Sequence, residues 1–374
     1  MWALAIKTLV ADRGKLLTAL VGVVFSIVLV NVQGGLFVGL IRKAGMLVDC
    51  GEADIWVGHR NIHNADLPRD IPERWIHRVR AVPGVRRAEP YLIGVTDMTL
   101  PSGAFEWVVV VGVDQSSLMG NAWNLVEGQP EAILQTDGII VDVCESRKLE
   151  YPQIGSLLEL GGRRARVVAK SEGIMGFLIM PYIFTTRQRA AAYLRRPADA
   201  CSYFLVELEP GYTAESVCAE IRRRVPELAA YSRQQYSRIT IDYWMKRTGL
   251  GISFGAATLL GLLVGLIMVA QTLYASVLDR LGEFGTLKAI GASERQVYTI
   301  VFAQAISMAL AGAIIGLLMA GTIQRLFSTP YAPIIIPAWL SLGSCALVLG
   351  ICLLASLLPY WRIRKVDPLM VLQG

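Results

Sequence analysis

Four long stretches of apolar residues run along the chain, one near its beginning and three in its last third. They cover residues 16–41, 249–278, 296–324 and 336–361, and none of them contains a charged residue. Each stretch exceeds the roughly 20 apolar residues that a helix needs to cross about 30 Å of hydrocarbon. The pattern therefore predicts four transmembrane helices, with a large polar segment, residues 42–248, between the first and the second.

Basic residues indicate which side of the membrane each connection occupies. They are Lys7, Arg13 and Lys15 before the first span, Arg280, Lys288 and Arg295 between the second and third, and Arg362, Arg364 and Lys365 after the fourth. Residues 326–337, between the third and fourth spans, contain no Lys or Arg. By the positive-inside rule both termini, the loop 279–295 and the tail 362–374 are cytoplasmic, whereas residues 42–248 and the short loop 325–335 lie outside. We therefore expect a multi-pass protein of the inner (plasma) membrane with a large periplasmic domain.

The segment ahead of the first span, residues 1–15, mixes apolar and basic positions. Trp2 and Leu9 alternate with Lys7 and Lys15 in a way that is compatible with a short amphipathic helix. Such a helix would lie on the cytoplasmic surface of the membrane before the chain enters it. A frayed tail is the alternative interpretation.

Short β-rich runs separated by turn residues fill the polar segment. They are residues 54–57, 85–95, 105–113, 138–143, 156–160, 164–170 and 203–208. Two amphipathic helical patterns, 72–81 and 214–225, each lead through a Pro-containing turn into a β-rich run, the second of which is 229–232. This repeated order predicts a mixed α/β domain of two subdomains, with the flanks of the segment forming one and its middle forming an inserted second one.

Composition supports a membrane protein and argues against a nucleic-acid partner. Hydrophobic residues make up 54% of the chain and charged residues only 18%, with a formal net charge of +6. Much of the basic excess lies at the cytoplasmic edges of the spans, where anionic lipid and topology account for it. We therefore expect membrane lipid, and no nucleic acid, among the partners.

The chain shows no constellation of catalytic residues. It lacks the Gly-x-x-x-x-Gly-Lys-Ser/Thr loop that cradles nucleotide phosphates, and carboxylates such as Asp97, Asp114 and Asp142 are scattered. His59 and His63 have the spacing of two metal ligands on a helix, but neither a matching Glu motif nor a Cys pair accompanies them. The sequence therefore predicts no enzyme activity, no metal site and no cofactor held by this chain.

Four cysteines, Cys50, Cys144, Cys201 and Cys218, fall in the external segment. An oxidising compartment would allow a disulfide among them. Their spacing identifies no pair, so the disulfide pattern stays open.

Small residues recur four positions apart within the spans. The pairs are Gly251 and Gly255, Gly261 and Gly265, and Gly312 and Gly316. Such pairs let helix backbones approach closely in lipid, although glycine is also common in membrane helices without that role. A few polar residues lie in or near the spans and should face protein or a cavity rather than lipid. These are Asn31, Gln33, Gln271 and Gln304.

The loop between the second and third spans carries the most specific pattern. Residues 282–296 read GEFGTLKAIGASERQ. This run resembles the hallmark of the FtsX-like permease family of ABC transporters, in which an acidic residue, a Leu-Lys/Arg-Ala core and Gly-Ala/Tyr-Ser precede the third span. The order of spans and the Arg-x-x-x-x-Asp-Pro pattern at 362–368 are similar to this family along the whole chain. Without a fused ATPase domain, and with Tyr243 and Trp244 before the second span, the chain most resembles DevC-type members of the FtsX-like and MacB-like group.

The resemblance implies a permease subunit whose ATP and Mg are bound by a separate ABC ATPase chain. That ATPase would dock on the loop after the second span, with apolar side chains filling its groove and charges fixing the register. The coupling residues would be Glu283, Phe284, Leu287, Lys288 and Ile290. In MacB-like members two permease chains pair, and nucleotide-driven motion passes along the first and second spans to the external domains. DevC-type relatives also work with a membrane-fusion protein and an outer-membrane duct, so we expect a homodimer with these partners.

The function that this resemblance implies is export of an amphipathic cargo, such as a lipid, a glycolipid or a hydrophobic small molecule. Two alternatives share the architecture. One is a non-transporting mechanical regulator of envelope hydrolases, and the other is a permease that releases lipoproteins. The size of the external segment favours export, because the regulators that resemble this chain carry a much smaller one.

Overall fold

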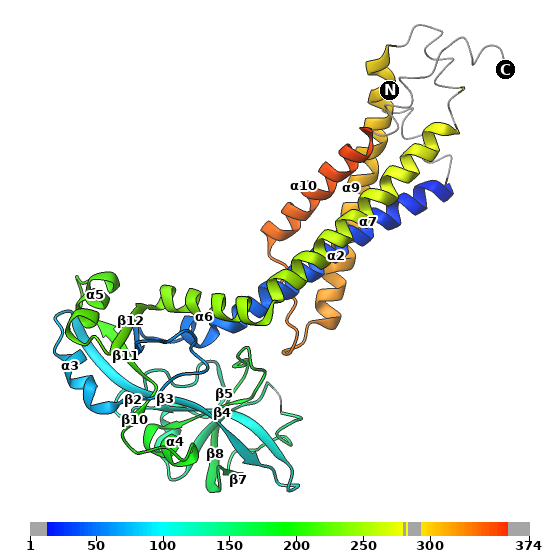
Figure 1. The fold of residues 1–374 in the computed structure, drawn as a ribbon. Coiled ribbons are helices and arrows are strands. Elements are labelled where there is room, and N and C mark those ends of the chain that lie inside the picture. Colours follow the sequence, from blue (N-terminus) through cyan, green and yellow to red (C-terminus); the bar gives the residue numbers. More distant parts are fainter. Residues whose placement is uncertain (1–12, 145, 280–281, 283–292, 358–374) are drawn as a thin grey trace. The chain divides into compact units, whose positions relative to one another are not determined.

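Two compact units make up the computed structural model of the chain (Figure 1). The residues that it describes are 13–144, 146–279, 282 and 293–357. Met1–Gly39 and Gly249–Gly374 belong to one unit, here called the membrane unit. Leu40–Thr248 form the other, here called the external domain.

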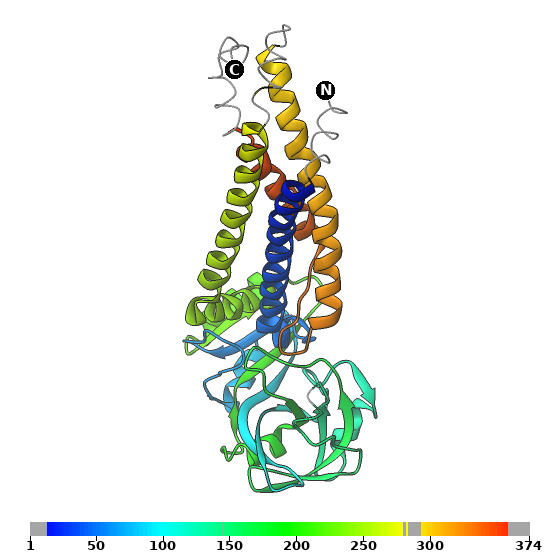
Figure 2. The ribbon, with the colours of Figure 1, turned by 90° about the vertical axis from the view of Figure 1, so that its right-hand side faces the viewer.

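Long helices build the membrane unit (Figures 1 and 2). They are α2 (Arg13–Asp49), whose residues from Leu40 on belong to the external domain, α7 (Leu250–Leu278), α9 (Glu294–Phe327) and α10 (Ala338–Ala355). Four stretches within them are long and apolar enough to cross a membrane: Leu16–Asp49, Leu250–Ala275, Tyr298–Phe327 and Ala338–Ala355. The prediction of four membrane helices is therefore confirmed.

The first helix is longer than the first predicted span. Helix α2 is a single helix of 37 residues, so it breaks neither after residue 15 nor after residue 41. At about 1.5 Å per residue it is roughly 55 Å long, well beyond the roughly 30 Å of hydrocarbon. No proline interrupts this segment, and an internal glycine such as Gly45 costs a helix only about 1 kcal/mol. Residues 1–12 of the expected surface helix and residues 358–374 lie outside the described residues.

Small and branched side chains from all four long helices form the core of the membrane unit. Buried members include Val23 and Ile27 of α2, Leu273 of α7, Met308 of α9 and Cys352 of α10. Because lipid tails are as apolar as these side chains, close packing rather than water exclusion holds the helices together.

One sheet runs through the whole external domain. Its strands are hydrogen-bonded in the order β12-β1-β11-β3-β4-β9-β6-β8-β5, and β7 pairs with both β3 and β8. The strands are β1 (Ile55–His59), β3 (Val85–Thr99), β4 (Phe105–Val113), β5 (Leu125–Glu127), β6 (Gly138–Asp142), β7 (Leu157–Leu160), β8 (Arg163–Ser171), β9 (Tyr182–Thr186), β11 (Tyr203–Leu208) and β12 (Leu228–Ser232). A separate small ladder joins β2 (Ile71–Pro72) to β10 (Ala200–Cys201).

The long strand β3 belongs to two subdomains. Its first part pairs with β11 and its second part pairs with β4. On the first part, β12, β1 and β11 complete a sheet that packs with α3 (Ile76–Arg80) and α5 (Ala214–Arg224) around a core that includes Phe204 and Ile221. These elements come from both flanks of the segment, so the predicted division into a flanking and an inserted subdomain is confirmed.

The inserted subdomain is a closed ring of strands. The ladder runs β3-β4-β9-β6-β8, and β7 closes it by pairing with β8 on one side and β3 on the other. Buried residues such as Ile139, Val167 and Ile183 fill the interior. Closure removes exposed sheet edges, which otherwise invite pairing with other chains.

Several elements were absent from the sequence-based prediction. Strand β9 and helix α4 (Arg187–Tyr193) follow each other directly in the inserted subdomain, and a short 3-10 turn occurs at Pro130–Leu134. The predicted helical pattern 72–81 is present as a 3-10 turn, Glu73–Trp75, followed by α3. The most consequential of the unpredicted elements is α6 (Arg233–Thr248), a helix of 16 residues between β12 and the second span. Its sequence mixes polar and aromatic residues, so no apolar stripe marks it.

Candidate functional site

Two glycines of α7 lie where that helix passes against α2. A Cβ atom at Gly261 would collide with Leu29, and one at Gly265 would collide with Ser26. The Ser26 hydroxyl donates a hydrogen bond to the Gly261 carbonyl oxygen over 3.1 Å. The missing side chains therefore permit both the close approach and this interhelical bond.

Helix α9 approaches α2 in the same way. A Cβ atom at Gly312 would clash with Val23, and one at Gly316 would lie 2.7 Å from side-chain carbons of Ile27. Helix α2 is thus the common neighbour of both glycine pairs. The third pair differs, because Gly255 has open space where a side chain would stand.

Gly251 and Gly255 instead line a shallow apolar groove of about 260 Å³ together with residues of α2. The aromatic rings of Phe37 and Phe254 meet beside it with centroids 5.6 Å apart. Within one chain, then, Gly255 makes no tight helix contact.

The polar residues of the spans fall into different environments. Asn31 is fully buried, and its Nδ2 donates to the Ser344 hydroxyl of α10 over 2.7 Å. Gln304 is also buried, and Gln33 is half-buried. Gln271 is exposed on α7, so no side chain of this chain covers it.

The predicted coupling residues lie outside the described residues. These are Glu283, Phe284, Leu287, Lys288 and Ile290. The end of their motif is described, because Ser293 caps α9: its hydroxyl accepts from the Gln296 backbone N–H, and the Gln296 side chain accepts from the Ser293 N–H over 2.9 Å. This capping box explains the Ser-x-x-Gln at the end of the motif and fixes where the third span begins.

Helix α6 connects the external domain to the second span. It ends at Thr248, and α7 begins at Leu250, with Gly249 between them at a φ of 64°. That left-handed conformation suits glycine and breaks the helix at this point. Inside the external domain, α6 also packs on the last turns of α2, because a Cβ at Gly45 would lie 2.7 Å from the Ser237 hydroxyl. Both segments that lead to spans therefore meet within the external domain.

A buried carboxylate holds α6 in place. Trp244 of α6 donates its indole N–H to Asp66 Oδ2 over 3.0 Å, and the Tyr182 hydroxyl of β9 donates to Oδ1 over 3.2 Å. The indole also stacks on Phe177, with ring centroids 4.4 Å apart. These contacts join α6, the loop after β1 and the inserted subdomain at one point.

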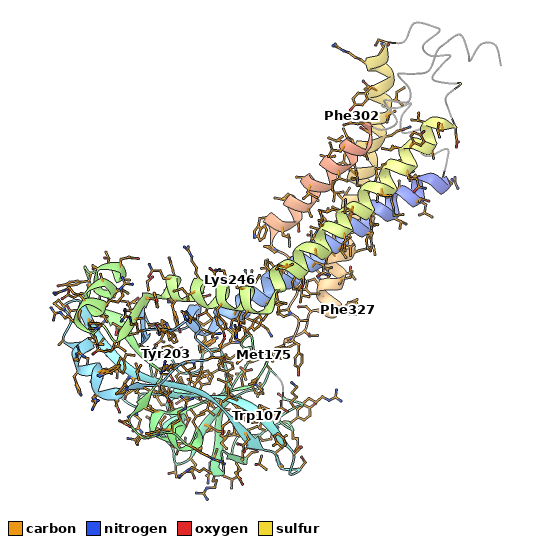
Figure 3. The ribbon with its side chains drawn as sticks, viewed as in Figure 1. Trp107, Met175, Tyr203, Lys246, Phe302 and Phe327 are labelled. Carbon is orange, nitrogen blue, oxygen red and sulfur yellow. The ribbon has the colours of Figure 1, made fainter. Side chains whose placement is uncertain are left out.

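Tyrosine hydroxyls secure the loop that carries Asp66. Tyr203 of β11 donates to the carbonyl oxygens of Asn64 and Ala65, and Tyr236 of α6 donates to that of Asn64. Tyr203 lies in the body of the external domain (Figure 3). The rings of Tyr203 and Tyr236 pack around Trp56, which is 2% exposed. The loop is therefore bound on several sides by groups that are themselves buried.

Burial raises the pKa of Asp66 from 3.8 to about 6, although the hydrogen bonds from Trp244 and Tyr182 act in the opposite direction. Desolvation penalises the ionised carboxylate more than two donors stabilise it. Asp142 in the inserted subdomain behaves likewise, because burial raises its pKa to about 6 against bonds from Ile174, Cys144 and Ser171. Asp142 is thus a buried carboxylate held by its own hydrogen bonds within the inserted subdomain.

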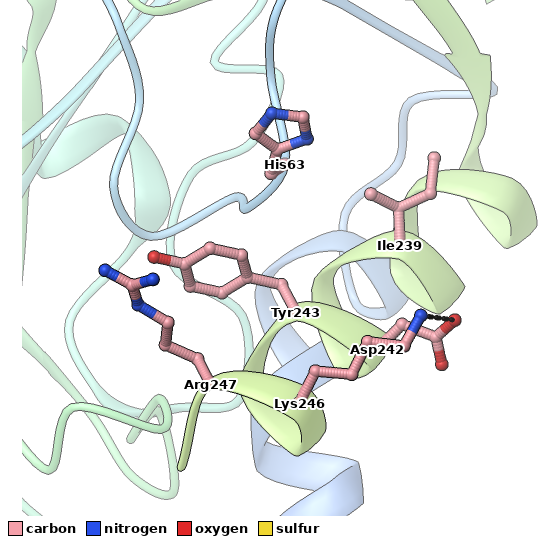
Figure 4. A pocket seen from close by; sticks show the side chains of 6 residues that line it. All are labelled: His63, Ile239, Asp242, Tyr243, Lys246 and Arg247. Carbon is pink, nitrogen blue, oxygen red and sulfur yellow. Dashed lines mark ion pairs between the residues drawn. The ribbon is translucent and has the colours of Figure 1, made fainter.

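A cleft of about 520 Å³ lies beside α6 (Figure 4). Its lining residues are His63, Ile239, Asp242, Tyr243, Lys246 and Arg247. All but His63 project from α6, and His63 comes from the loop that faces the helix. Lys246 and Asp242 form a loose, exposed ion pair at 3.9 Å.

The structure does not bring the candidate histidines together on a helix, and three of the candidate cysteines are free thiols. His59 ends β1 and His63 lies in the loop that follows, so the two do not share a helix. Among the described residues no cluster of three or more His, Cys, Asp or Glu side chains could hold a metal ion. Cys201 and Cys218 are both buried in the flanking subdomain as free thiols, and Cys50 is an exposed free thiol.

Comparison with known families identifies the two parts of the chain. The model of the MacB-like periplasmic core domain matches residues 16–224, and that of the FtsX-like permease C-terminal region matches residues 255–368. The chain belongs to the FtsX-like and MacB-like family of ABC transporter permeases. The predicted family is therefore confirmed, and a permease of this kind works with an ABC ATPase.

Relatives with similar sequences are themselves called permeases. This permease is 24% identical over 359 residues to an uncharacterized ABC transporter permease of Mycobacterium tuberculosis, covering 94% of this chain and 93% of that one. It is 26% identical over 190 residues to an uncharacterized ABC transporter permease of Methanocaldococcus jannaschii, covering 46% of each chain.

Two solved structures are similar to the permease over about half its length. One is the periplasmic region of MacB from Actinobacillus actinomycetemcomitans, at 7% identity and a TM-score of 0.39, covering 50% of this chain and 92% of that one. The other is the extracellular domain of the noncanonic ABC-type transporter YknZ from Gram-positive bacteria, at 13% identity and a TM-score of 0.37. The match covers 47% of this chain and 98% of that one.

Sequence reasoning missed the buried site of the permease. Trp244 was noted only as a feature of the subtype, and Asp66 was not singled out at all. The available signal was a carboxylate two residues after Asn64 in a loop directly after a strand, a position where Asx turns are common. Its indole and hydroxyl donors lie more than a hundred residues further along the chain, so the sequence could not pair them with it.

Proposed function

We propose that this permease is the membrane subunit of an exporter in which a separate ATPase drives motion of the external domain. The cargo is amphipathic, such as a lipid, a glycolipid or a hydrophobic small molecule. The chain works as a homodimer in the inner membrane with both termini in the cytoplasm. By analogy with DevC-type relatives, a membrane-fusion protein and an outer-membrane duct carry the cargo onward.

The packing of α6 is the observation that supports this proposal most. Trp244 fixes α6 to Asp66 in the external domain, and α6 continues through Gly249 into the second span. The end of α2, which carries the first span, packs on the same helix at Gly45. Movement of either span would therefore displace α6 and the side chains packed on it, which is how motion could pass from the spans to the external domain.

Coupling begins in this proposal at the loop after the second span. Phe284, Leu287 and Ile290 enter an apolar groove of the ATPase, while Glu283 and Lys288 set the register. ATP and Mg stay with the ATPase, because the chain has no phosphate-binding loop of its own.

Co-expression with the cognate ATPase tests the proposal. The purified complex is placed in liposomes, and ATP-dependent release of a fluorescent phospholipid is measured. The variants Glu283→Lys and Lys288→Glu should each weaken the complex about tenfold or more and abolish release, since charge reversal puts like charges together. Arg295→Glu, a charge reversal at the start of α9 outside the coupling residues, is the matched control. It should change neither the affinity for the ATPase nor the release of phospholipid.

Each contrary outcome has a definite meaning. Unchanged complex formation and release in both variants would remove the coupling role of the loop. An intact complex that moves no phospholipid but activates a periplasmic hydrolase would replace export with mechanical regulation. Release of lipoproteins alone would assign the chain to lipoprotein release.

A further inference from the structure

We propose that the cleft beside α6 binds the phosphate group of an anionic membrane lipid. Lys246 and Arg247 supply the positive charge, the Tyr243 hydroxyl and the His63 ring supply further hydrogen-bonding groups, and Ile239 forms an apolar part of the wall (Figure 4). A volume of about 520 Å³ accommodates a phosphate with its attached glycerol. The inference stands whether or not the permease is an exporter.

Charge in the cleft favours an anion. Asp242 is the one carboxylate of its lining, and its pair with Lys246 is long, at 3.9 Å, with both side chains more than two-thirds exposed. An exposed pair of this kind contributes little energy, so Lys246 can turn to a better anionic partner at small cost. Arg247 adds a second cation whose planar guanidinium suits two phosphate oxygens at once.

Both walls of the cleft are held in position before any ligand arrives. On the helix side, the Tyr243 ring packs edge-on against Trp244, which Asp66 and Phe177 fix in turn. On the loop side, His63 directly precedes Asn64, whose carbonyl accepts from the hydroxyls of buried tyrosines. Preformed walls lower the entropy cost of binding. This distinguishes the cleft from an ordinary solvated helix face.

The position of the cations along the chain identifies the ligand as a lipid rather than a soluble phosphate. Arg247 comes three residues before Leu250, where the second membrane helix begins. Even fully extended, three residues span at most about 11 Å, so the chain keeps Arg247 within reach of the headgroups beside that helix. Tyr is enriched at both membrane interfaces, and long Lys and Arg side chains near the end of a span extend to the headgroups.

Lipid binding by the full-length permease tests the inference without an ATPase. Purified chain in a zwitterionic detergent is titrated with short-chain phosphatidylglycerol, with phosphatidylcholine and with inorganic phosphate, and bound lipid is counted by native mass spectrometry. We expect phosphatidylglycerol to bind at least about tenfold more tightly than phosphatidylcholine, and the double variant Lys246→Glu with Arg247→Glu to lose this preference. Arg238→Glu, an exposed reversal on the same helix outside the cleft, is the matched control and should keep it.

Three results would overturn the inference. One is a preference for phosphatidylglycerol that survives the double variant. Another is an equal loss in the Arg238→Glu control, which would indicate a general surface charge effect. The third is inorganic phosphate binding as tightly as phosphatidylglycerol, which would make the ligand a soluble phosphate. Because no transport is measured, these results are independent of whether export itself is found.

Discussion

Different residue types stabilise the two units: glycines at the helix contacts of the membrane unit, and large buried side chains in the external domain. At the α2 contacts of the membrane unit, the decisive positions are Gly261, Gly265, Gly312 and Gly316, where a side chain is missing. Around α6 in the external domain, the decisive groups are large rings and a buried carboxylate. In lipid the hydrophobic effect does not drive apolar side chains together, so close packing of complementary surfaces stabilises the helix contacts. In water the hydrophobic effect favours the burial of large aromatic rings. In the external domain, the buried carboxylate and its indole donor fix the helix that leads to the second span.

Removing the indole of Trp244 should have the largest effect on the stability of the external domain. Trp244→Ala should destabilise the external domain by about 3–5 kcal/mol, because it leaves a cavity against Phe177 and deprives Asp66 of a donor. Thermal unfolding of the full chain followed by near-ultraviolet circular dichroism measures the loss. Trp107→Ala, at a half-exposed position on β4, is the control and should cost less than about 1 kcal/mol. Equal effects of both changes would show that Trp244 has no special role.

The Asp66 carboxyl should make stability depend on pH. Its pKa is about 6 in the folded chain and near 3.8 unfolded, so between these values the folded state holds a proton that the unfolded state has lost. The contribution of Asp66 to stability should therefore be highest below pH 4, fall by about 3 kcal/mol as pH rises to 6, and level off above it. Asp66→Asn should remove this share of the slope, measured by unfolding at several pH values.

Asp142 titrates in the same range, because its pKa is also raised to about 6. The Asp66→Asn variant should therefore keep part of the slope, and a second change, Asp142→Asn, should remove most of the remainder. A slope that is unchanged in Asp66→Asn would mean that the carboxyl is not desolvated as the structure indicates.

Replacing a glycine at a helix contact should weaken packing in the membrane unit. Gly265→Leu should destabilise helix packing by about 1–3 kcal/mol, because its side chain would displace Ser26 and part α7 from α2. The loss can be measured by unfolding in mixed detergent micelles. Gly255→Leu is the matched change on the same helix and should cost much less, since open space surrounds that position within the chain. A large cost at Gly255 would instead indicate that a second copy of the permease packs there.

The smallest effect should come from the loose ion pair of α6. Lys246→Gln should change the free energy of unfolding by less than about 0.5 kcal/mol, because the pair with Asp242 is long and exposed. The same variant should still weaken phosphatidylglycerol binding in the titration described above. A clear loss of stability without a loss of binding would make the residue structural.

Much of the architecture could be predicted because it follows from local pattern. Strands β4 and β11 match the predicted runs 105–113 and 203–208 at both ends, since alternating or continuous β-branched and aromatic residues mark them. Helix α6 escaped prediction because its buried side is made of Tyr236, Ser237, Thr240 and Trp244, which carry polar atoms and leave no apolar stripe.

By itself, the sequence determined the four spans, the α/β character of the external domain and the family. Those features depend on apolar length, on residue alternation and on a short motif, all of which are read along the chain. Only the tertiary structure decided which glycines meet α2, that Trp244 donates to Asp66, and that His63, Lys246 and Arg247 line one cleft. These contacts join residues far apart in sequence, and their energies depend on burial and geometry that exist only once the chain has folded.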